Sequence, residues 1–414
     1  MSKRRGECMK YVLKTVFVFV LSIFLMQPAY ALNGLKLIGV GASSPVLGGT
    51  GTVRAQDTGG LLCNPASIAY VTPRIDAATQ FGIIDVKLDT SNAAYGNFRN
   101  TTAGEQRSEA ETVWLPHLGF CGQYKGTPWY YGFAATVTSG LVVGFKHSRI
   151  SEAVTGNTYD KNISLTVIEF IPTVAYKPIP QLSLGVSPVL TMQRFKSDFI
   201  NSGLAETEGG NNADYSWGGG FNVGAIYDIN TYLSVGCAYK SPRWSERFDE
   251  YKDVLRDRPN MPPEYSAGIA LMPTDALLIE TDVKFIQWRA VDLFRKSPEH
   301  HGYGWENQWT VGIGVQYTLF DRLKLRAGYN YGRSPVRSGT LFANTMSSLI
   351  TEHHLGVGVG YDVTKHVTVD FGWVHEFENK MVDDGSGDTY SQLGKGSKVA
   401  FSVDDFMLGL SYRF

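Results

Sequence analysis

The residues best placed to do chemistry are five charged side chains that recur at every second position in two segments of the chain. Three lie in segment 277–286 and two in segment 322–331, where apolar residues take the positions between them. Side chains two residues apart on a β-strand share a face, so each segment gathers its charges on one face. We interpret the set as an inward-facing structural network of salt bridges rather than as an acid–base site. The five residues are Glu280, Asp282, Lys284, Lys324 and Arg326.

The sequence gives little support to catalysis or to a metal centre. No serine, histidine and carboxylate stand out as a nucleophile with its base. The adjacent histidines at 300–301 and at 353–354 would point to opposite faces of a strand. The acidic run 383–388 lacks the ligand spacing and the terminal Glu of a calcium loop. We therefore predict no enzyme activity, no metal site and no cofactor.

Alternation of apolar and polar residues from about Arg74 onward predicts a membrane-spanning β-barrel. The last nine residues, 406–414, have an apolar residue at every second position and stop on Phe414. One face of such a strand meets lipid and the other a polar lumen. A Lys or Arg at the lipid midplane would cost roughly 2–4 kcal/mol, so the charged faces must point inward. A soluble antiparallel strand alternates too, so the rest of the chain must decide between the two.

The connections between the alternating segments are alternately short and long. Six short ones are rich in turn residues, such as 125–128 and 320–322, and seven long polar stretches lie between them. Together they join fourteen strands, with both ends on the short-turn side, which is periplasmic in such barrels. We expect an all-β fold: a 14-stranded antiparallel transmembrane β-barrel over 73–414, in the bacterial outer membrane.

The N-terminal part breaks this pattern. Residues 1–31 combine a basic region, a short apolar core and Ala29-Tyr30-Ala31, as a secretory signal peptide does. Their removal takes five of the 38 Lys and Arg and one of the 39 Asp and Glu, which leaves a charge of about −5 and does not favour nucleic-acid binding. Residues 32–72 are Gly-, Ser- and Thr-rich and too irregular for a strand. They form either a disordered leader or a plug in the lumen, since a barrel this wide is filled or leaves a channel.

Three cysteines remain in the mature chain, and an odd number cannot all pair. They are Cys63, Cys121 and Cys237. We expect Cys63 of the plug and Cys121, near the periplasmic end of its strand, to lie within reach of each other. Export would permit a disulfide between them, and the sequence does not decide whether it forms.

A series of short motifs follows one another along the mature chain. They are Gly48 to Gly51, Asp57 to Gly60, Cys63 to Ala66, Tyr239 to Pro242, Met261 to Gly268, Thr274-Asp275, Glu280 to Val283 ahead of Trp288, Trp309 to Gly314, Leu325 to Tyr329, Ser334 to Val336 and Val369 to Gly372. In order and spacing they resemble the FadL/TodX family of outer-membrane transporters for long-chain fatty acids and other hydrophobic compounds. The resemblance covers nearly all of the mature chain.

The resemblance implies a barrel occluded by an N-terminal hatch, whose last motif here is Asn64-Pro65-Ala66. It also implies a hydrophobic pocket on the extracellular side and sideways release of ligand through an opening made by an inward kink of the third strand. That strand corresponds to 129–145, and Ser139-Gly140 is its expected flexible point. The alternative is that Gly140 only starts a surface loop.

One position departs from the family pattern. Members that take long-chain fatty acids carry an acidic residue ahead of Ser-Pro-Val, where it takes part in the head-group site. This chain has Arg333 beside that place. Arg333 either binds a ligand carboxylate through a charge-assisted hydrogen bond or is a solvated loop charge.

We therefore predict passive outer-membrane transport of hydrophobic small molecules, with long-chain fatty acids as the first choice. Aromatic hydrocarbons or other lipids are one alternative, and a diffusion pore or a structural barrel is another. The expected partners are the hydrophobic ligand, the outer-membrane lipid and the barrel assembly machinery, which would recognise the chain through Phe414. We expect a monomer.

Overall fold

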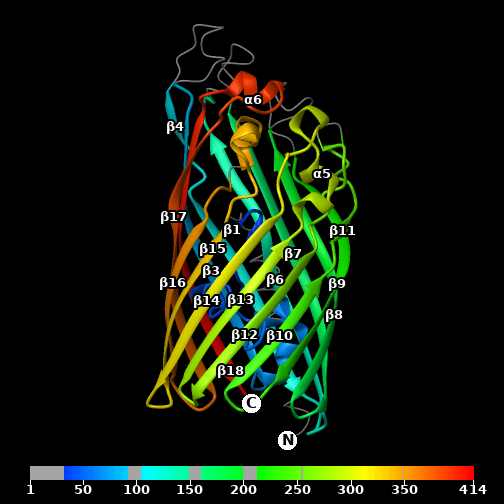
Figure 1. Ribbon diagram of the computed structural model, residues 1–414, viewed down its shortest axis with the longest axis vertical. Coiled ribbons are helices and arrows are strands. Elements are labelled where there is room, and N and C mark those ends of the chain that lie inside the picture. The colour runs from blue at the N-terminus through cyan, green and yellow to red at the C-terminus, as the bar shows by residue number, and fades with distance from the viewer. Residues whose placement is uncertain (1–31, 92–103, 149–159, 199–211, 253–254, 348) are drawn as a thin grey trace, which may run out of the picture.

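The computed structural model describes residues 32–91, 104–148, 160–198, 212–252, 255–347 and 349–414. In this part of the chain, fourteen long antiparallel strands form one closed barrel (Figure 1), which confirms the predicted fold class. The predicted signal peptide lies outside the described residues. The barrel strands are β3 (Arg74–Asp89), β5 (Thr112–Gln123), β6 (Trp129–Phe145), β7 (Lys161–Ile179), β8 (Leu182–Ser197), β9 (Asp214–Asp228), β10 (Leu233–Lys240), β12 (Glu264–Thr274), β13 (Leu277–Ile286), β14 (Gln308–Leu319), β15 (Leu323–Gly332), β16 (His353–Asp362), β17 (Val367–Val382) and β18 (Lys398–Arg413).

Each strand pairs with its neighbours in sequence, and the ring closes between β3 and β18, from Arg74 opposite Arg413 to Asp89 opposite Lys398. Short turns lie at the lower end in Figure 1, with the C-terminus, and the long connections lie at the upper end. Among the described residues, no helix is long and apolar enough to cross a membrane. The upper connections carry β4 (Glu105–Arg107), β11 (Trp244–Ser245), η3 (Trp288–Ala290), α5 (Asp292–Arg295), η4 (Pro298–His300), η5 (Ser338–Thr340), η6 (Phe342–Ser347) and α6 (Thr389–Gly394).

The two faces of the wall differ as the alternation predicts. In β13, Val283 faces outward and is 38% exposed, whereas Asp282 and Lys284 are buried. Asp282 lies opposite Gly312 of β14. A slip of one residue would turn every charge of this strand toward lipid, so the pattern specifies the register strongly.

Some strands run further up than the alternation predicts. Strand β3, for example, continues to Asp89. In this upper part the faces exchange character: Ile84 and Val86 point inward and are buried, and Asp85 points outward. Arg107 of β4 donates two hydrogen bonds to Asp85, at 2.7 and 2.8 Å. Outward charges that pair across strands thus let the wall extend beyond its apolar band.

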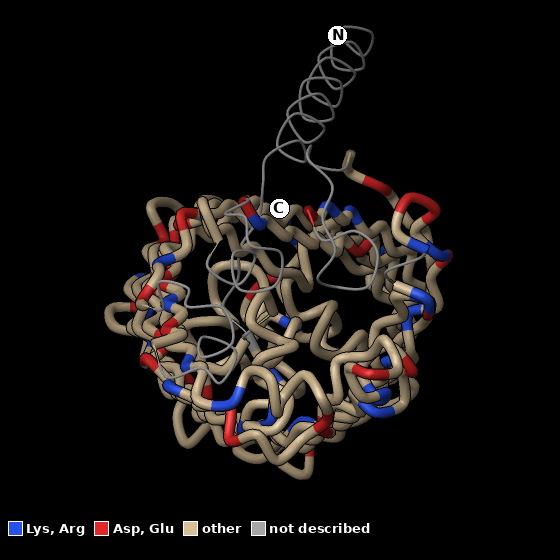
Figure 2. The backbone as a smooth tube through the Cα atoms, turned by 90° about the horizontal axis from the view of Figure 1, so that it is seen from above, with Lys and Arg blue, Asp and Glu red and all other residues tan. Residues whose placement is uncertain are grey.

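The N-terminal segment, residues 32–72, lies inside the ring of strands, and Figure 2 shows tube crossing the interior. Its residue Gly48 has φ of 69°, which favours glycine. It packs against the inner wall so closely that a Cβ added to Gly328 of β15 would lie 2.2 Å from the nitrogen of Gly48. Glycines on the inner wall therefore make room for this segment. Its elements are β1 (Leu32–Asn33), β2 (Lys36–Leu37), η1 (Pro45–Leu47), α2 (Gly60–Cys63) and η2 (Pro65–Tyr70).

Candidate ligand cavities and wall opening

The third barrel strand, β6, separates from β5 partway up the wall. It pairs with β7 from end to end, with a bulge between Val137 and Ser139. With β5 it pairs only as far as Thr136, opposite His117, although β5 goes on pairing with β3. We call the unpaired stretch between residues 112–116 of β5 and 137–143 of β6 the wall gap.

Hydrogen bonds close the wall gap at its upper end. The amide of Glu109 donates to the carbonyl of Gly144 at 2.8 Å, and the amide of Gly144 donates to the hydroxyl of Ser108 at 3.1 Å. At the lower end, Pro116 directly precedes the last paired residue of β5 and has no N–H to offer a neighbouring strand. The wall gap is therefore bounded above and below within the described residues.

The N-terminal segment takes the place of β5 beside the kinked strand. Lys36 of β2 pairs with Ser139, and the amide of Gly140 donates to the carbonyl of Leu35 at 3.0 Å. Residues 134–141 of β6 are buried on both faces, unlike an ordinary barrel strand with one face toward lipid. This part of β6 is therefore drawn into the lumen and held there by the N-terminal segment.

An apolar cavity lies above this segment. The β13–β14 connection covers it with stacked aromatic rings, Phe294 and Trp305, whose centroids are 5.0 Å apart. The indole N–H of Trp305 donates to Asn344 of η6 at 2.8 Å, which joins two upper connections over the cavity. The lining residues are Leu35, Leu141, Leu165, Gln193, Phe195, Phe248, Leu255, Pro259, Met261, Leu293, Phe294, Tyr303, Trp305 and Ser347.

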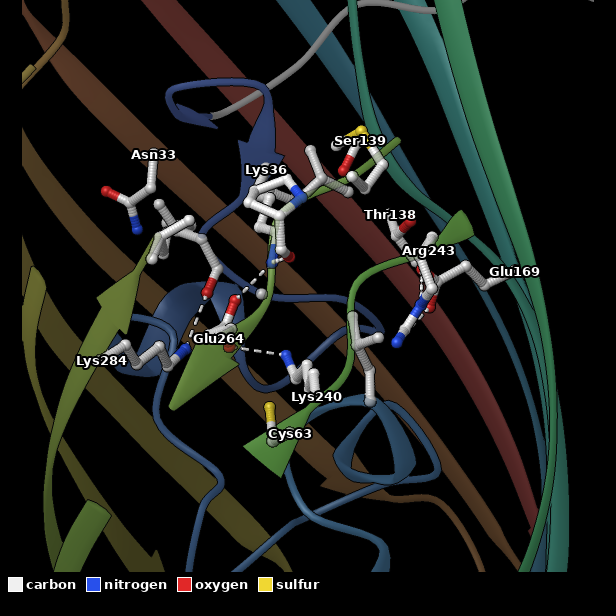
Figure 3. A pocket seen from close by; sticks show the side chains of 17 residues that line it. Asn33, Lys36, Cys63, Thr138, Ser139, Glu169, Lys240, Arg243, Glu264 and Lys284 are labelled. Carbon is white, nitrogen blue, oxygen red and sulfur yellow. Dashed lines mark hydrogen bonds and ion pairs between the residues drawn. The ribbon is translucent and has the colours of Figure 1, made fainter. Parts of the chain in front are cut away.

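A second cavity, which is lined by charged residues, shares Met261 with the apolar one. We call it the polar cavity. Figure 3 shows Lys36 and Lys240 on either side of Glu264. The ammonium of Lys240 lies 2.7 Å and that of Lys36 3.1 Å from the carboxylate of Glu264. These two lysines, from the N-terminal segment and from β10, thus share one carboxylate.

The other charges of the polar cavity have their own partners. Arg243 donates to Glu169 at 2.9 and 3.3 Å. Lys284 donates to the backbone carbonyl of Gly49 at 2.6 Å. Burial lowers the pKa of Lys36 to about 8, although the neighbouring carboxylate of Glu264 raises it. Lys36 therefore loses its charge at a lower pH than an exposed lysine does.

Carboxylates of the wall hold the N-terminal segment through its backbone. Asp282 accepts hydrogen bonds from the amides of Gly51 and Thr52 at 3.1 and 3.0 Å, and Glu280 accepts from the amide of Val53 at 2.8 Å. Hydrogen bonds to charged acceptors are the stronger kind. The segment is therefore fixed to β13 at consecutive residues.

The segment is also braced internally and at its lower end. Asp57 accepts from the amides of Ser43 and Gly59 at 3.0 and 2.9 Å, and burial raises the pKa of its carboxyl group. The ring of Tyr70 lies between Arg54 and Lys177, at 3.9 and 4.0 Å from its centroid. Lys177 thus holds η2 against the lower end of β7, and Arg54 braces the same ring from within the segment.

Comparison with protein families places this architecture. The profile of the family described as "Outer membrane protein transport protein (OMPP1/FadL/TodX)" matches residues 26–257 and 258–414. The chain belongs to this family. It is accordingly an outer-membrane β-barrel of a family that transports hydrophobic compounds, as the motifs predicted.

Solved structures of the FadL/TodX family share the fold. The toluene transporter TodX of Pseudomonas putida superposes with a TM-score of 0.70 at 17% identity, over 92% of this chain and 99% of that one. A FadL homologue of Pseudomonas aeruginosa gives 0.67 at 15% identity, over 92% and 100%. Outer membrane protein P1 of Haemophilus influenzae is 24% identical over 227 residues, 48% of each chain. The match to such curated relatives thus spans about half of their length.

The predicted hatch motif lies at a contact between the N-terminal segment and the wall. The side chain of Asn64 caps η2 by accepting from the amide of Ala66 at 2.9 Å, and it donates to the carbonyl of Thr52 at 2.7 Å. Ser183 of β8 donates to the carbonyl of Ala66 at 2.8 Å. Pro65 starts η2 and is buried. The motif therefore turns the chain into η2 and binds the N-terminal segment to the inner wall at β8.

The five inward charges fall into two groups by their direct partners, and a chain of hydrogen bonds through Gln316 and Gln56 links the groups. Glu280, Asp282 and Lys284 contact the N-terminal segment, as described above. Lys324 instead pairs with Asp362 at 3.2 Å, and Arg326 pairs with Asp370 at 2.5 Å. Both groups face inward, but the second braces β15 against β16 and β17.

Arg333 is exposed and lines neither cavity, so its predicted head-group role has no support from its position. The three cysteines are free thiols. The sulfur of Cys63 lies 3.9 Å from the hydroxyl of Ser44, and that of Cys121 lies 3.8 Å from the carbonyl of Thr72. The structure therefore contains no disulfide between Cys63 and Cys121, a question that the sequence left open.

The grouping of Lys36 and Lys240 around Glu264 was not predicted. Lys36, Lys240 and Glu264 come from three distant segments, and only two of them stand in family motifs, Tyr239 to Pro242 and Met261 to Gly268. A charge within two residues of a proline in each of those motifs was the available signal. It did not indicate that the two would meet.

Proposed function

We propose that this chain takes up amphipathic hydrophobic acids, with long-chain fatty acids as the first choice, and releases them sideways through the wall gap. The apolar cavity would bury the hydrocarbon part, at about 25 cal/mol per Å² of apolar surface removed from water. The adjoining polar cavity would receive the head group.

One observation carries the choice of an acid. Lys36 and Lys240 share the single carboxylate of Glu264. A buried charge is costly unless it is paired, so a second carboxylate in this place would be stabilised by the ammonium group that Glu264 does not fully balance. A ligand with a carboxylate at one end of an apolar chain would match the lysines of the polar cavity and the apolar lining of the other cavity.

The firm seating of the N-terminal segment supports sideways release. Passage straight down the lumen would require the amides of residues 51–54 to leave Glu280 and Asp282, and Tyr70 to leave Lys177 of β7. Passage through the wall gap requires rearrangement near Leu35 and Gly140, where one backbone hydrogen bond and the neighbouring pair join the segment to β6 among the described residues.

The replacement Lys240→Met tests this function. In calorimetric titrations of the full-length protein in detergent, we expect affinity for oleate to fall about ten- to hundredfold, since a hydrogen bond to a charged group contributes about 1.5–3 kcal/mol. Affinity for toluene should not change. Lys324→Met is the matched control, because Lys324 pairs with Asp362 and lines neither cavity. Equal effects of Lys240→Met on both ligands would contradict an acid-binding site.

Uptake of monoaromatic hydrocarbons is the second candidate. Two observations favour it: the stacked rings over the apolar cavity, and the fold shared with a protein named as a toluene transporter. Tight binding of toluene with no binding of oleate by the unaltered protein would establish this alternative in place of the first.

A further inference from the structure

One residue that lines the apolar cavity carries a buried polar atom without a partner. Gln193 of β8 lines this cavity and is 1% exposed. Within the described residues, its side-chain oxygen Oε1 accepts no hydrogen bond. A buried acceptor without a donor is unfavourable, and most such atoms in proteins are satisfied. This oxygen therefore needs an explanation.

The orientation of the Gln193 amide is fixed by its other end. Its Nε2 donates to the carbonyl of Pro259 at 2.7 Å and to the hydroxyl of Ser245 at 2.8 Å. A carbonyl oxygen can only accept, so the atom facing Pro259 must be the nitrogen, and the amide cannot be turned around. The unpartnered atom is thus the oxygen, which can only accept.

Other polar groups of the lining do not impose the same requirement. The hydroxyl of Ser347 already donates to Asn344, and the indole N–H of Trp305 donates to the same residue. The hydroxyl of Tyr303 can rotate to donate or to accept, so it does not discriminate between ligands. Gln193 Oε1 alone among these groups calls for a donor.

We propose that Gln193 is a specificity-determining residue, which selects hydrophobic ligands that carry a hydroxyl group on their apolar body. A ligand hydroxyl in the cavity would donate a hydrogen bond to Oε1. This bond would replace the one that the hydroxyl gives up when it leaves water. A plain hydrocarbon of the same shape would leave Oε1 unsatisfied. The inference rests on the proposed function, in that the apolar cavity must hold the ligand's apolar part.

Matched aromatic probes test the proposal without involving the polar cavity, because none of them carries a carboxylate. We would measure affinities of 4-methylphenol and toluene for the full-length protein and for Gln193→Met, which keeps the shape but removes the amide. The ratio of the two affinities should fall about two- to tenfold in favour of toluene in Gln193→Met. Thr191→Val, two residues away on the same face of β8 and outside the cavity, should leave the ratio unchanged.

A second comparison needs no variant at position 193, in case Gln193→Met does not assemble. The unaltered protein should bind 4-methylphenol more tightly, relative to the partition of each compound into hexadecane, than it binds 4-fluorotoluene, which has the same shape and no donor. Affinities that follow hexadecane partition alone, or an unchanged ratio in Gln193→Met, would overturn the role of Gln193 while leaving the transport function intact. Failure of all three probes to bind would instead contradict the cavity assignment, and with it both proposals.

Discussion

The amide of Gly140 in β6 donates a hydrogen bond to the carbonyl of Leu35 in the N-terminal segment at 3.0 Å. A barrel strand normally gives this bond to its neighbour in the wall. Here β5 has already separated from β6, and the segment inside the lumen takes over as partner. The kink of β6 and the position of the N-terminal segment therefore depend on the same hydrogen bonds. A change in one should alter the other.

The replacement Gly140→Val should slow uptake without preventing assembly. A β-branched residue restricts the backbone at the bulge and places a side chain beside the wall gap. We expect uptake of labelled oleate by cells to fall several-fold, with unchanged heat-modifiable migration in gels. Gly219→Val is the control, since Gly219 lies in a fully paired part of β9 and its added Cβ would meet only the carbonyl of Val189. Uptake at the normal rate in Gly140→Val would show that Gly140 does not govern passage.

Removal of the carboxylates that hold the N-terminal segment should open the lumen to ions. We expect the double replacement Glu280→Ala and Asp282→Ala to raise conductance in planar bilayers, because the amides of residues 51–54 lose their side-chain acceptors, and a buried donor left without a partner costs about 1–3 kcal/mol. Asp362→Ala, which breaks the ion pair to Lys324, is the control. Deletion of residues 32–72 gives the highest conductance to be expected, because it removes the whole N-terminal segment. A deletion protein that conducts no more than the full chain would contradict a plugging role.

The wall of the barrel could be predicted from the sequence because its rule is local. Strand β13 begins and ends at the predicted residues, 277 and 286, and β6 at 129 and 145. Successive residues of a strand take opposite faces of the wall, so the face of one residue gives the face of the next. A charged side chain that faces lipid carries a large energetic cost. These two rules were enough to predict that Asp282 and Lys324 point inward.

The ligand cavities could not be predicted in this way, because they depend on residues that meet across the lumen. Lys36 and Glu264 lie 228 positions apart in sequence. Alternation tells which face a side chain takes, but not which residue lies opposite it in the interior. The same limit explains Arg333: its family motif drew attention to it, but its exposure depends on where the strand ends relative to the cavities.

The replacement Arg333→Ala should have little effect on ligand binding. Because Arg333 is exposed and lines neither cavity, we expect less than a twofold change in affinity for oleate and for toluene. Calorimetric titrations of Arg333→Ala and Lys240→Met with the same two ligands compare the two variants directly. A selective loss of oleate affinity in Arg333→Ala would restore Arg333 as the head-group residue and remove the case for Lys36 and Lys240.

The mature protein should contain three free thiols. Cys63 and Cys121 have different neighbours, Ser44 and the carbonyl of Thr72. Burial raises the pKa of the Cys63 thiol, which slows its reaction because the thiolate is the reactive form. Thiol titration after unfolding without reductant should therefore count three groups. A count of one would show that Cys63 and Cys121 form a disulfide in the exported protein.

Binding of anionic ligands should weaken at mildly alkaline pH. The pKa of Lys36 is about 8, so its ammonium group is present below that pH and is lost as the pH rises through it, whereas an ordinary lysine stays charged to above 10. With dodecyl sulfonate, whose own charge does not change in this range, affinity should fall between pH 7 and 9.5, with a midpoint at or somewhat above 8, since a bound anion favours the charged lysine. Lys36→Arg, which stays charged throughout, should flatten the profile. The same fall in Lys36→Arg, or a flat profile in the unaltered protein, would separate Lys36 from head-group binding and leave Lys240 as the remaining candidate.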